Sequence, residues 1–311
     1  MTAIPLISVI IPTYNHAHFL REALESVCAQ TYTNWEVIVI NNYSQDDTIE
    51  VVESFKDSRI HLENFRNNGV IAASRNRGIA LAHGKYLAFL DSDDLWFPEK
   101  LAHCVARLEG GCDLVCHGLR WFGNGRERDK FYGPVHRATF AALLDRGNCI
   151  ATSATVVSKD LVALVGGVSE EPEIITAEDY HLWLKLARTG AKMNFIDQVL
   201  GGYRFHTANT GSVIRQANAV KHVVEDFFPE EQSRTLRDRI RLRFRYGIIN
   251  YGVGRSMQAN DQFFAALSYF LRSLVLHPFY LKTYIALALN IFCINIDKQR
   301  SHLSKCEHKY R

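Results

Sequence analysis

The sequence lacks the features that mark a secreted, disulfide-stabilised protein. Its seven cysteines are scattered and odd in number, and only Cys112 and Cys116 lie close together. No second pair complements these two, as a zinc site would require. Free thiols in a reducing cytoplasm are therefore the expectation. The first residues, Met1 to Pro5, also lack the basic region of a signal peptide.

A strong charge of either sign is missing too. The net charge is +3 over 311 residues, of which 47% are hydrophobic and 22% are charged. These values are ordinary for a globular protein and argue against a dedicated nucleic-acid binder. The length allows one large domain or two smaller ones.

Two common phosphate-binding motifs are absent as well. Residues 6–11 form an apolar, β-branched run that predicts a buried strand. The turn after it is Pro12–Asn15 instead of the glycine-rich turn of a dinucleotide-binding fold, and no Walker loop occurs. A nucleotide, if one binds, must therefore be held in another way.

The sequence does contain a regular alternation of strand and helix patterns. Short apolar runs predict strands, and apolar positions at helical spacing predict the helices between them. The further strands are predicted at 35–40, 60–62 and 86–90, and the helices at 19–27, 48–55 and 71–83. Strands that alternate with helices imply a mostly parallel sheet.

Three carboxylates, Asp91, Asp93 and Asp94, follow the predicted strand 86–90. Such close negative charges repel one another, and a divalent cation such as Mg²⁺ or Mn²⁺ would compensate them. Ligands of open α/β sheets collect at the carboxyl ends of the strands, where these side chains would lie. The alternative is a solvated turn in which Asp94 caps a helix near residues 98–100.

Four motifs occur in one order: Ser8–Asn15, Glu36–Ile40 with its polar turn, Ala73–Gly78 and Leu90–Asp94. Together they resemble the family 2 glycosyltransferases, which are nucleotide-sugar-dependent, inverting enzymes of the GT-A fold. The resemblance covers at least residues 4–210. It implies an α/β fold with a mostly parallel sheet flanked by helices, and a divalent metal, Mn²⁺ or Mg²⁺.

The resemblance also implies roles for individual residues. Those expected at the nucleotide sugar are Pro12, Thr13, Tyr14, Asn42, Arg75, Asp91, Ser92 and Asp93. Those expected at the metal are Asp91, Asp93, Asp94 and His206. The family usually has an acidic pair where this chain has Asn41 and Asn42. An asparagine can still accept a hydrogen bond from uracil, but it can also donate one, and a UDP-sugar remains the expected donor.

A second acidic pair, Glu178 and Asp179, precedes a run of helix-forming residues. Carboxylates at a helix N-terminus are favoured by its dipole, so capping is one interpretation. The resemblance implies instead that Asp179 is the general base. Glu178 and Trp183 are candidates for contact with the acceptor, and core packing is the alternative for Trp183.

The remaining segments carry weaker signals. Further strands are predicted at 113–121, 148–157 and 195–200, and the polar loop 123–129 is either part of acceptor recognition or merely exposed. Beyond residue 212, helices are predicted around the arginine-rich segment 234–246 and at 265–276 and 281–296. The last run is shorter than the roughly 20 residues that span a bilayer. These helices pack on the catalytic domain or lie in the plane of the inner membrane leaflet.

The sequence thus predicts a cytoplasmic glycosyltransferase, with peripheral membrane contact through its C-terminal helices as an option. Residues 1–212 would form the catalytic domain, with a nucleotide-sugar half to about 110 and an acceptor half from 111, and 213–311 a helical region. The acceptor would be a hydroxyl of a saccharide or lipid-linked saccharide in bacterial surface polysaccharide synthesis. One rival is a nucleotidyltransferase, which commonly carries a glycine-rich basic loop. The other is a non-catalytic nucleotide-sugar-binding protein, which needs no base.

Overall fold

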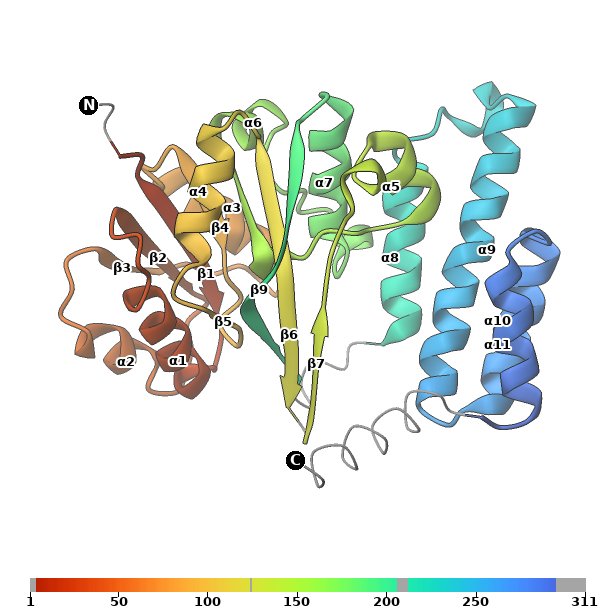
Figure 1. Cartoon of the computed structure of the whole chain (residues 1–311), viewed down its shortest axis with the longest axis horizontal. Helices are drawn as coiled ribbons and strands as arrows, with labels where there is room; N and C mark the ends of the chain where they lie inside the picture. The colour runs from red at the N-terminus through yellow and green to blue at the C-terminus, as the bar shows by residue number, and fades with distance from the viewer. Residues whose placement is uncertain (1–3, 124, 206–211, 295–311) are drawn as a thin grey trace. The chain divides into compact units, whose positions relative to one another are not determined.

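The computed structural model describes residues 4–123, 125–205 and 212–294 of the chain (Figure 1). The chain divides into two compact units. The first unit consists of residues 1–143 and 148–209, and the second of residues 144–147 and 210–311. We describe each unit separately.

The first unit is built on one mixed sheet in the order β3-β2-β1-β4-β8-β6-β9-β5, with β7 paired to β6. The first four positions of this order are parallel, as are β6 and β9, whereas β8, β5 and β7 run antiparallel to their neighbours. The strands are β1 (Ile7–Thr13), β2 (Trp35–Asn41), β3 (Ile60–Asn64), β4 (Tyr86–Phe89), β5 (Leu95–Trp96), β6 (Leu114–Gly123), β7 (Arg126–Lys130), β8 (Thr155–Ser158) and β9 (Met193–Arg204).

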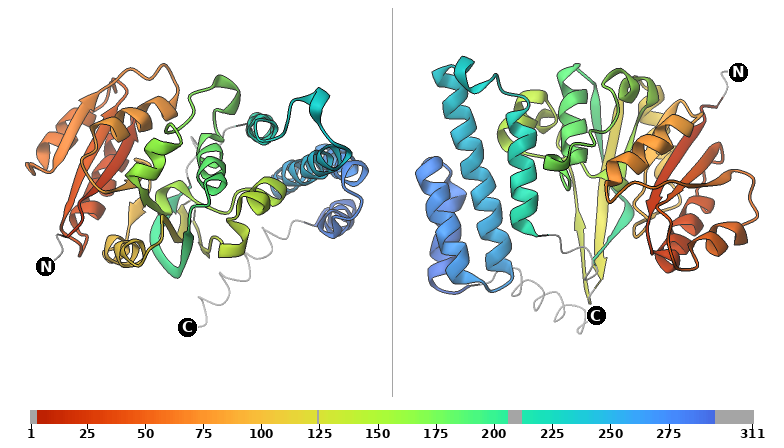
Figure 2. Two further views of the ribbon diagram at one scale, coloured as in Figure 1. Left: turned by 90° about the horizontal axis from the view of Figure 1, so that it is seen from above. Right: turned by 180° about the vertical axis from the view of Figure 1, so that it is seen from behind.

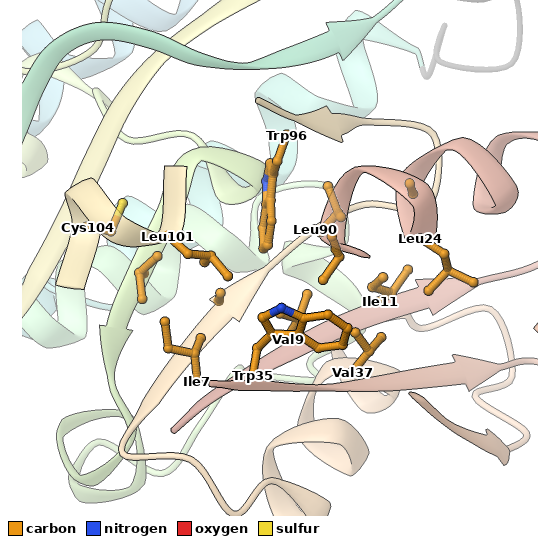
Figure 3. Close-up of a cluster of buried hydrophobic side chains, with 14 of the residues drawn as sticks. Ile7, Val9, Ile11, Leu24, Trp35, Val37, Leu90, Trp96, Leu101 and Cys104 are labelled. Carbon is orange, nitrogen blue, oxygen red and sulfur yellow. The ribbon is translucent and has the colours of Figure 1, made fainter. Parts of the chain in front are cut away.

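Helices cover both faces of this sheet (Figure 2). On one face an apolar cluster joins the sheet to three helices, α1 (Ala17–Cys28), α2 (Thr48–Ser54) and α4 (Lys100–Glu109). Figure 3 shows part of this cluster, with Trp35 and Val9 from the sheet and Leu101 and Leu24 from the helices. All residues of β1 and β2 are buried, as their continuous apolar sequences predict.

On the other face lie α3 (Ile71–Leu81) and α7 (Glu178–Arg188). Gly78 lets α3 approach β1 closely, since a Cβ atom there would lie 2.6 Å from Ile10 Cγ2. Trp183 of α7 packs edge-on against Phe89 of β4, with ring centroids 6.4 Å apart. Two short helices complete the connections, α5 (Phe140–Arg146) and α6 (Lys159–Leu164).

The second unit is helical and contains α8 (Val213–Glu225), α9 (Leu236–Ala259), α10 (Phe263–Leu276) and α11 (Leu281–Ile291). A capping box starts α9, in which Thr235 and Asp238 each accept a hydrogen bond from the other's backbone. The core between α10 and α11 is small and centres on Ala266, Phe270 and Ala286. Among the described residues, none of the helices is both long and apolar enough to traverse a bilayer.

The predicted fold class is confirmed, but two local predictions were wrong. The segment predicted as strand 148–157 contains a 3₁₀ turn at Thr152–Ala154, and the strand begins only at Thr155. The polar loop 123–129 is largely strand β7, whose backbone pairs with β6 although its charged sequence has no strand pattern. The alternative in which Asp94 caps a helix is excluded, because α4 begins only at Lys100.

Candidate active site

The loops that follow β1 and β2 are bonded to each other. Thr13 and Asn41, the last residues of the two strands, lie side by side in the parallel ladder. The backbone amide of Asn15 donates to Ser44 Oγ at 2.9 Å, and its side-chain Oδ1 accepts from the amide of Gln45 at 2.8 Å. Asp46 accepts from the amide of Ala17 at the start of α1. These bonds hold the two loops together at the carboxyl edge of the sheet. We call the polar surface formed by residues 12–17 and 41–46 the polar ledge.

Residues expected at the nucleotide lie on this ledge. Pro12 and Thr13 are buried at the end of β1, and the Thr13 hydroxyl has no hydrogen-bond partner within the described structure. Tyr14 is 53% exposed. Asn42 uses its side-chain oxygen to accept from the amide of Asn67 at 3.0 Å, so this oxygen already has one donor.

The acidic run after β4 lies at the same edge of the sheet, because β4 is parallel to β1. The Asp91 amide donates to Ser153 Oγ at 3.2 Å, and Ser92 Oγ lies 3.1 Å from His16 Nδ1. Asp94 is buried, and its Oδ1 accepts from the Arg204 amide at 3.0 Å. Burial, followed by the charges of Asp91 and Asp93, raises the pKa of Asp94 well above its usual range.

Arg75 connects this acidic run to α7. Its guanidinium donates to Asp91 Oδ1 and to Glu178 Oε1, each at 2.9 Å. Its side chain is only 7% exposed. Burial alone would lower the pKa of Arg75, but the two carboxylates raise it overall, so the guanidinium stays charged. Two acids that are far apart in the sequence thus share one buried cation.

The first turn of α7 holds the second acidic pair. Asp179 Oδ2 accepts from the Thr152 hydroxyl at 2.9 Å, and its Oδ1 accepts from the Tyr180 amide at 2.6 Å. Burial, and then the charge of Glu178, raises the pKa of Asp179 to about 6. A carboxylate with such a pKa is suited to accepting a proton near neutral pH. The helix starts at Glu178 as predicted, and Ala177 occupies the capping position.

Two residues that were candidates for acceptor contact lie in the interior. Glu178 is buried, and besides Arg75 its carboxylate accepts from the Thr176 amide at 2.8 Å. Trp183 is completely buried, which corresponds to the packing alternative. His206, a predicted metal ligand, lies outside the described residues.

The strand-end acids suit a hard divalent cation, although the described residues contain no group of three or more His, Cys, Asp or Glu side chains that could hold a metal by themselves. Mg²⁺ is usually held by one or two carboxylates together with substrate phosphates and water, so a complete protein cage is not required. One oxygen of Asp94 is buried without a hydrogen-bond partner in the described part of the chain. Asp91 is 31% exposed. The donor set is therefore appropriate for a phosphate-bound metal.

Several residues of the site could not be identified from sequence motifs. Arg204 donates to the Asp93 carbonyl at 3.0 Å, and its guanidinium lies 4.8 Å from the ring centroids of both Phe19 and Phe122. Thr152 and Ser153, which bond Asp179 and Asp91, lie in the turn that was mistaken for a strand. No local pattern marks these residues, since their partners are distant in sequence.

Comparisons with known proteins identify the family. A model of glycosyl transferase family 2 matches residues 8–153, and a model of glycosyl transferase family group 2 matches residues 86–297. The chain is 30% identical over 224 residues to a UDP-Glc:alpha-D-GlcNAc-diphosphoundecaprenol beta-1,3-glucosyltransferase of Escherichia coli, covering 70% of this chain and 86% of that protein. It is 29% identical over 204 residues to TuaG of Bacillus subtilis, a glycosyltransferase named for teichuronic acid biosynthesis, covering 64% and 79%.

Solved structures support the fold. One is S. aureus TarS 1-349 in complex with UDP-GlcNAc, with a TM-score of 0.58 at 18% identity, covering 96% of this chain and 92% of that one. Another is the mannosyltransferase PcManGT from Pyrobaculum calidifontis with GDP-Man and Mn²⁺, with a TM-score of 0.58 at 18% identity, covering 94% and 86%. The fold is that of the GT-A-type transferases. The chain belongs to glycosyltransferase family 2.

Proposed function

We propose that this enzyme transfers a sugar from a UDP-sugar to a hydroxyl of a saccharide or lipid-linked saccharide, with inversion at the anomeric carbon. The relative in Escherichia coli, which acts on a diphosphoundecaprenol-linked sugar, and the relative named for teichuronic acid biosynthesis support a role in bacterial surface polysaccharide synthesis. The UDP-GlcNAc complex of TarS supports a uridine donor.

In this proposal the polar ledge after β1 and β2 binds the nucleotide. The Thr13 hydroxyl, which is buried without a partner in the described structure, would bond the nucleoside, and exposed Tyr14 would cover it. Asn42 would face the base with the part of its amide that Asn67 leaves unused. Residues 1–110 would thus form the donor half of a catalytic domain that extends to about 212, with the acceptor half from 111.

The diphosphate would lie at the strand-end acids. Asp91, Ser92 and Asp93 would face it, and Asp91, Asp93 and Asp94 would hold Mn²⁺ or Mg²⁺. When bound, such a cation neutralises charge on the leaving diphosphate. The Mn²⁺ in the PcManGT complex supports the use of a divalent cation. Arg75 would keep Asp91 oriented through its 2.9 Å bond, in place of the direct donor contact that sequence motifs predict.

The observation that carries the proposal is the link from Asp91 through Arg75 to Glu178, because it brings the predicted metal site and the predicted base together. Asp179 would take the proton from the acceptor hydroxyl, and the oxygen would attack the anomeric carbon from the face opposite the diphosphate. Thr152 would fix the orientation of the carboxylate by its 2.9 Å bond. One base and one displacement invert the configuration.

A screen of nucleotide sugars with Mn²⁺ tests the reaction class. Slow hydrolysis needs no knowledge of the acceptor, so release of UDP is expected from the true donor alone. Release of pyrophosphate would indicate the rival nucleotidyltransferase, and the absence of turnover with every donor and acceptor would leave a binding protein.

The variant Asp93→Asn should abolish metal-dependent donor binding. It should keep the fold, because removing a charge relieves the repulsion among the acids. Unchanged Mn²⁺ affinity would refute the metal assignment.

We further propose that the second unit attaches the enzyme to the cytoplasmic face of an anionic membrane. Large apolar side chains are exposed along α10 and α11, and exposed cations accompany them, among them Arg272 on α10 and Lys282 on α11. Arg243 of α9 donates to the carbonyl of Val275, a residue that is 69% exposed. A surface that combines apolar side chains with cations suits anionic lipid.

A further inference from the structure

The β6–β7 hairpin carries two basic side chains on one face. Arg128 lies directly opposite Trp121 in the antiparallel ladder, and Lys130 lies opposite Leu119. Residues two apart on a strand point to the same side of the sheet. The Lys130 ammonium is 4.0 Å from the centroid of the Trp121 ring, and the Arg128 guanidinium is 4.9 Å from it. Both cations therefore rest on one indole.

Trp121 is fixed by an aromatic cluster. Its Nε1 donates to the Tyr132 hydroxyl at 3.2 Å. Its ring lies 5.0 Å from that of Tyr203 and 4.9 Å from that of Phe205, centroid to centroid. The support for the two cations is thus rigid and comes from three segments of the chain.

No acidic side chain in the described part of the chain forms an ion pair with Arg128 or Lys130. The acids of the same hairpin, Glu127 and Asp129, bind Arg120 instead. Lys130 is half-buried, and burial followed by the charge of Arg128 lowers its pKa to about 8. Two adjacent cations without a counter-ion, one of them half-buried, are unfavourable unless an anion joins them.

This face of the hairpin lies near the strand-end acids. Tyr203 precedes Arg204, whose amide donates to Asp94. Burial, followed by the charges of Asp94, Asp91 and Asp93, raises the pKa of Tyr203. The aromatic cluster therefore lies between the basic pair and the predicted site of the reacting diphosphate.

We propose that Arg128 and Lys130, held against Trp121, form a subsite for a diphosphate group of one of the two substrates. The inference rests on the proposed function, in which the donor carries a diphosphate and a lipid-linked acceptor carries another. The guanidinium offers a planar fork of donors and the ammonium a compact charge, and the two together suit the several oxygens of a diphosphate.

Kinetics of Lys130→Gln and Arg128→Gln test the subsite, with Arg120→Gln as the matched control. The control removes one positive charge from the same hairpin, but from a residue already paired with Asp129 at 2.8 Å. Donor KM is measured from the release of UDP during hydrolysis, when no acceptor is present. Acceptor KM is measured with a diphosphate-linked sugar and with the same sugar as an alkyl glycoside.

Loss of a charge-assisted hydrogen bond should weaken binding about ten- to hundredfold. A rise in KM confined to the diphosphate-linked acceptor supports the subsite and assigns it to the acceptor. A rise in donor KM with every acceptor supports it and assigns it to the donor. Unchanged KM values for both substrates, or an equal rise in the Arg120→Gln control, would overturn the proposal.

A second measurement does not depend on turnover. Lys130, with its lowered pKa, should be acylated faster than ordinary lysines near pH 8. Inorganic pyrophosphate should protect it severalfold, while labelling of Lys85, which is ion-paired with Glu109 on another part of the unit, should not change. Equal labelling of Lys130 with and without pyrophosphate would exclude the subsite. If no donor is ever hydrolysed but protection occurs, the proposed reaction fails and the subsite stands.

Discussion

Most proteins place polar side chains outside and apolar side chains inside. The two units differ in which kind of side chain departs from this rule. The first unit buries charged and polar groups: Arg75, Asp94 and Glu178 lie inside at the carboxyl edge of its sheet. The second unit also buries one charged residue, Arg245, but large apolar side chains are exposed along its helices. Phe264 is 91% exposed, and Phe279 is 77% exposed. Buried charge is costly and marks sites of chemistry, whereas clustered exposed apolar surface marks sites of contact. This comparison is the basis for proposing catalysis in the first unit and membrane attachment in the second.

The strongest test of the catalytic unit is Asp179→Asn. The amide keeps the size of the carboxylate but cannot accept the proton, so turnover at saturating donor should fall by about 10² to 10⁴. Nucleotide affinity, measured by calorimetry, should change little because the proposed nucleotide contacts come from other loops. Near wild-type turnover would remove Asp179 from the mechanism. Loss of donor binding would place it in the nucleotide site and direct the search for the base to Glu178.

The second largest effect is expected on stability, from Arg75→Met. This change leaves Glu178 buried without its cation, and breaking a buried ion pair from one side costs about 3–5 kcal/mol. Chemical denaturation measures the loss. The matched control is Arg77→Met in the same helix, whose bond to Glu63 is partly exposed to solvent and should contribute no more than about 1 kcal/mol. Equal losses in the two variants would show that the buried bridge is not structurally important.

Some strands of the first unit could be predicted from the sequence, and others could not. The strands β1, β2 and β4 could be predicted because they are buried on both faces and their apolar runs are continuous. The acids at their ends, together with the motif at Arg75, indicated the candidate site. Strand β7 could not be predicted, since Arg126–Lys130 is entirely polar and owes its form to backbone pairing with β6.

Partners within the site could not be predicted for a related reason. Arg75 matches a motif that suggested donor contact, yet its position between Asp91 and Glu178 depends on how α3 and α7 pack against one sheet. Arg204 belongs to no motif and reaches Asp93 from the end of β9. A sequence pattern reports which residue types are present at an element's end, but not which side chains from distant elements they meet.

The proposed membrane attachment through the second unit is tested by comparing Leu281→Ser with Leu164→Ser. Leu281 of α11 is 73% exposed, and Leu164 in the first unit is 74% exposed. Burying a leucine in lipid is worth about 1.5–3 kcal/mol, so Leu281→Ser should lower partitioning into anionic vesicles by about tenfold or more. Leu164→Ser should leave partitioning unchanged, and both variants should keep their stability within about 0.5 kcal/mol. Equal effects of the two substitutions, or no vesicle binding by the unaltered enzyme at low salt, would contradict the assignment.

A smaller effect is expected from pH. The pKa of Asp179 is raised to about 6, and only the deprotonated carboxylate can act as a base. The logarithm of kcat/KM should therefore fall with slope one as the pH drops below about 6, which is a tenfold loss per pH unit. The profile is measured with a soluble acceptor to separate it from membrane binding. A profile that stays flat down to about pH 4.5 would mean that the base titrates elsewhere.

The smallest expected effect comes from Thr152→Val, which removes the hydroxyl that donates to Asp179 at 2.9 Å. This hydrogen bond stabilises the charged carboxylate and lowers the pKa of Asp179 against the effect of burial. A single hydrogen bond contributes about 0.5–1.5 kcal/mol, and 1.36 kcal/mol corresponds to one pH unit. The acidic limb of kcat/KM should therefore move to higher pH by up to about one unit. The rate on the alkaline plateau should change less, since the carboxylate there is deprotonated in both proteins. The sign is the decisive observation, because a merely structural role of Thr152 would lower the rate at every pH and leave the midpoint in place. A midpoint that moves to lower pH would show that the hydroxyl favours the protonated form, and Thr152 would then not be the residue that keeps this base charged.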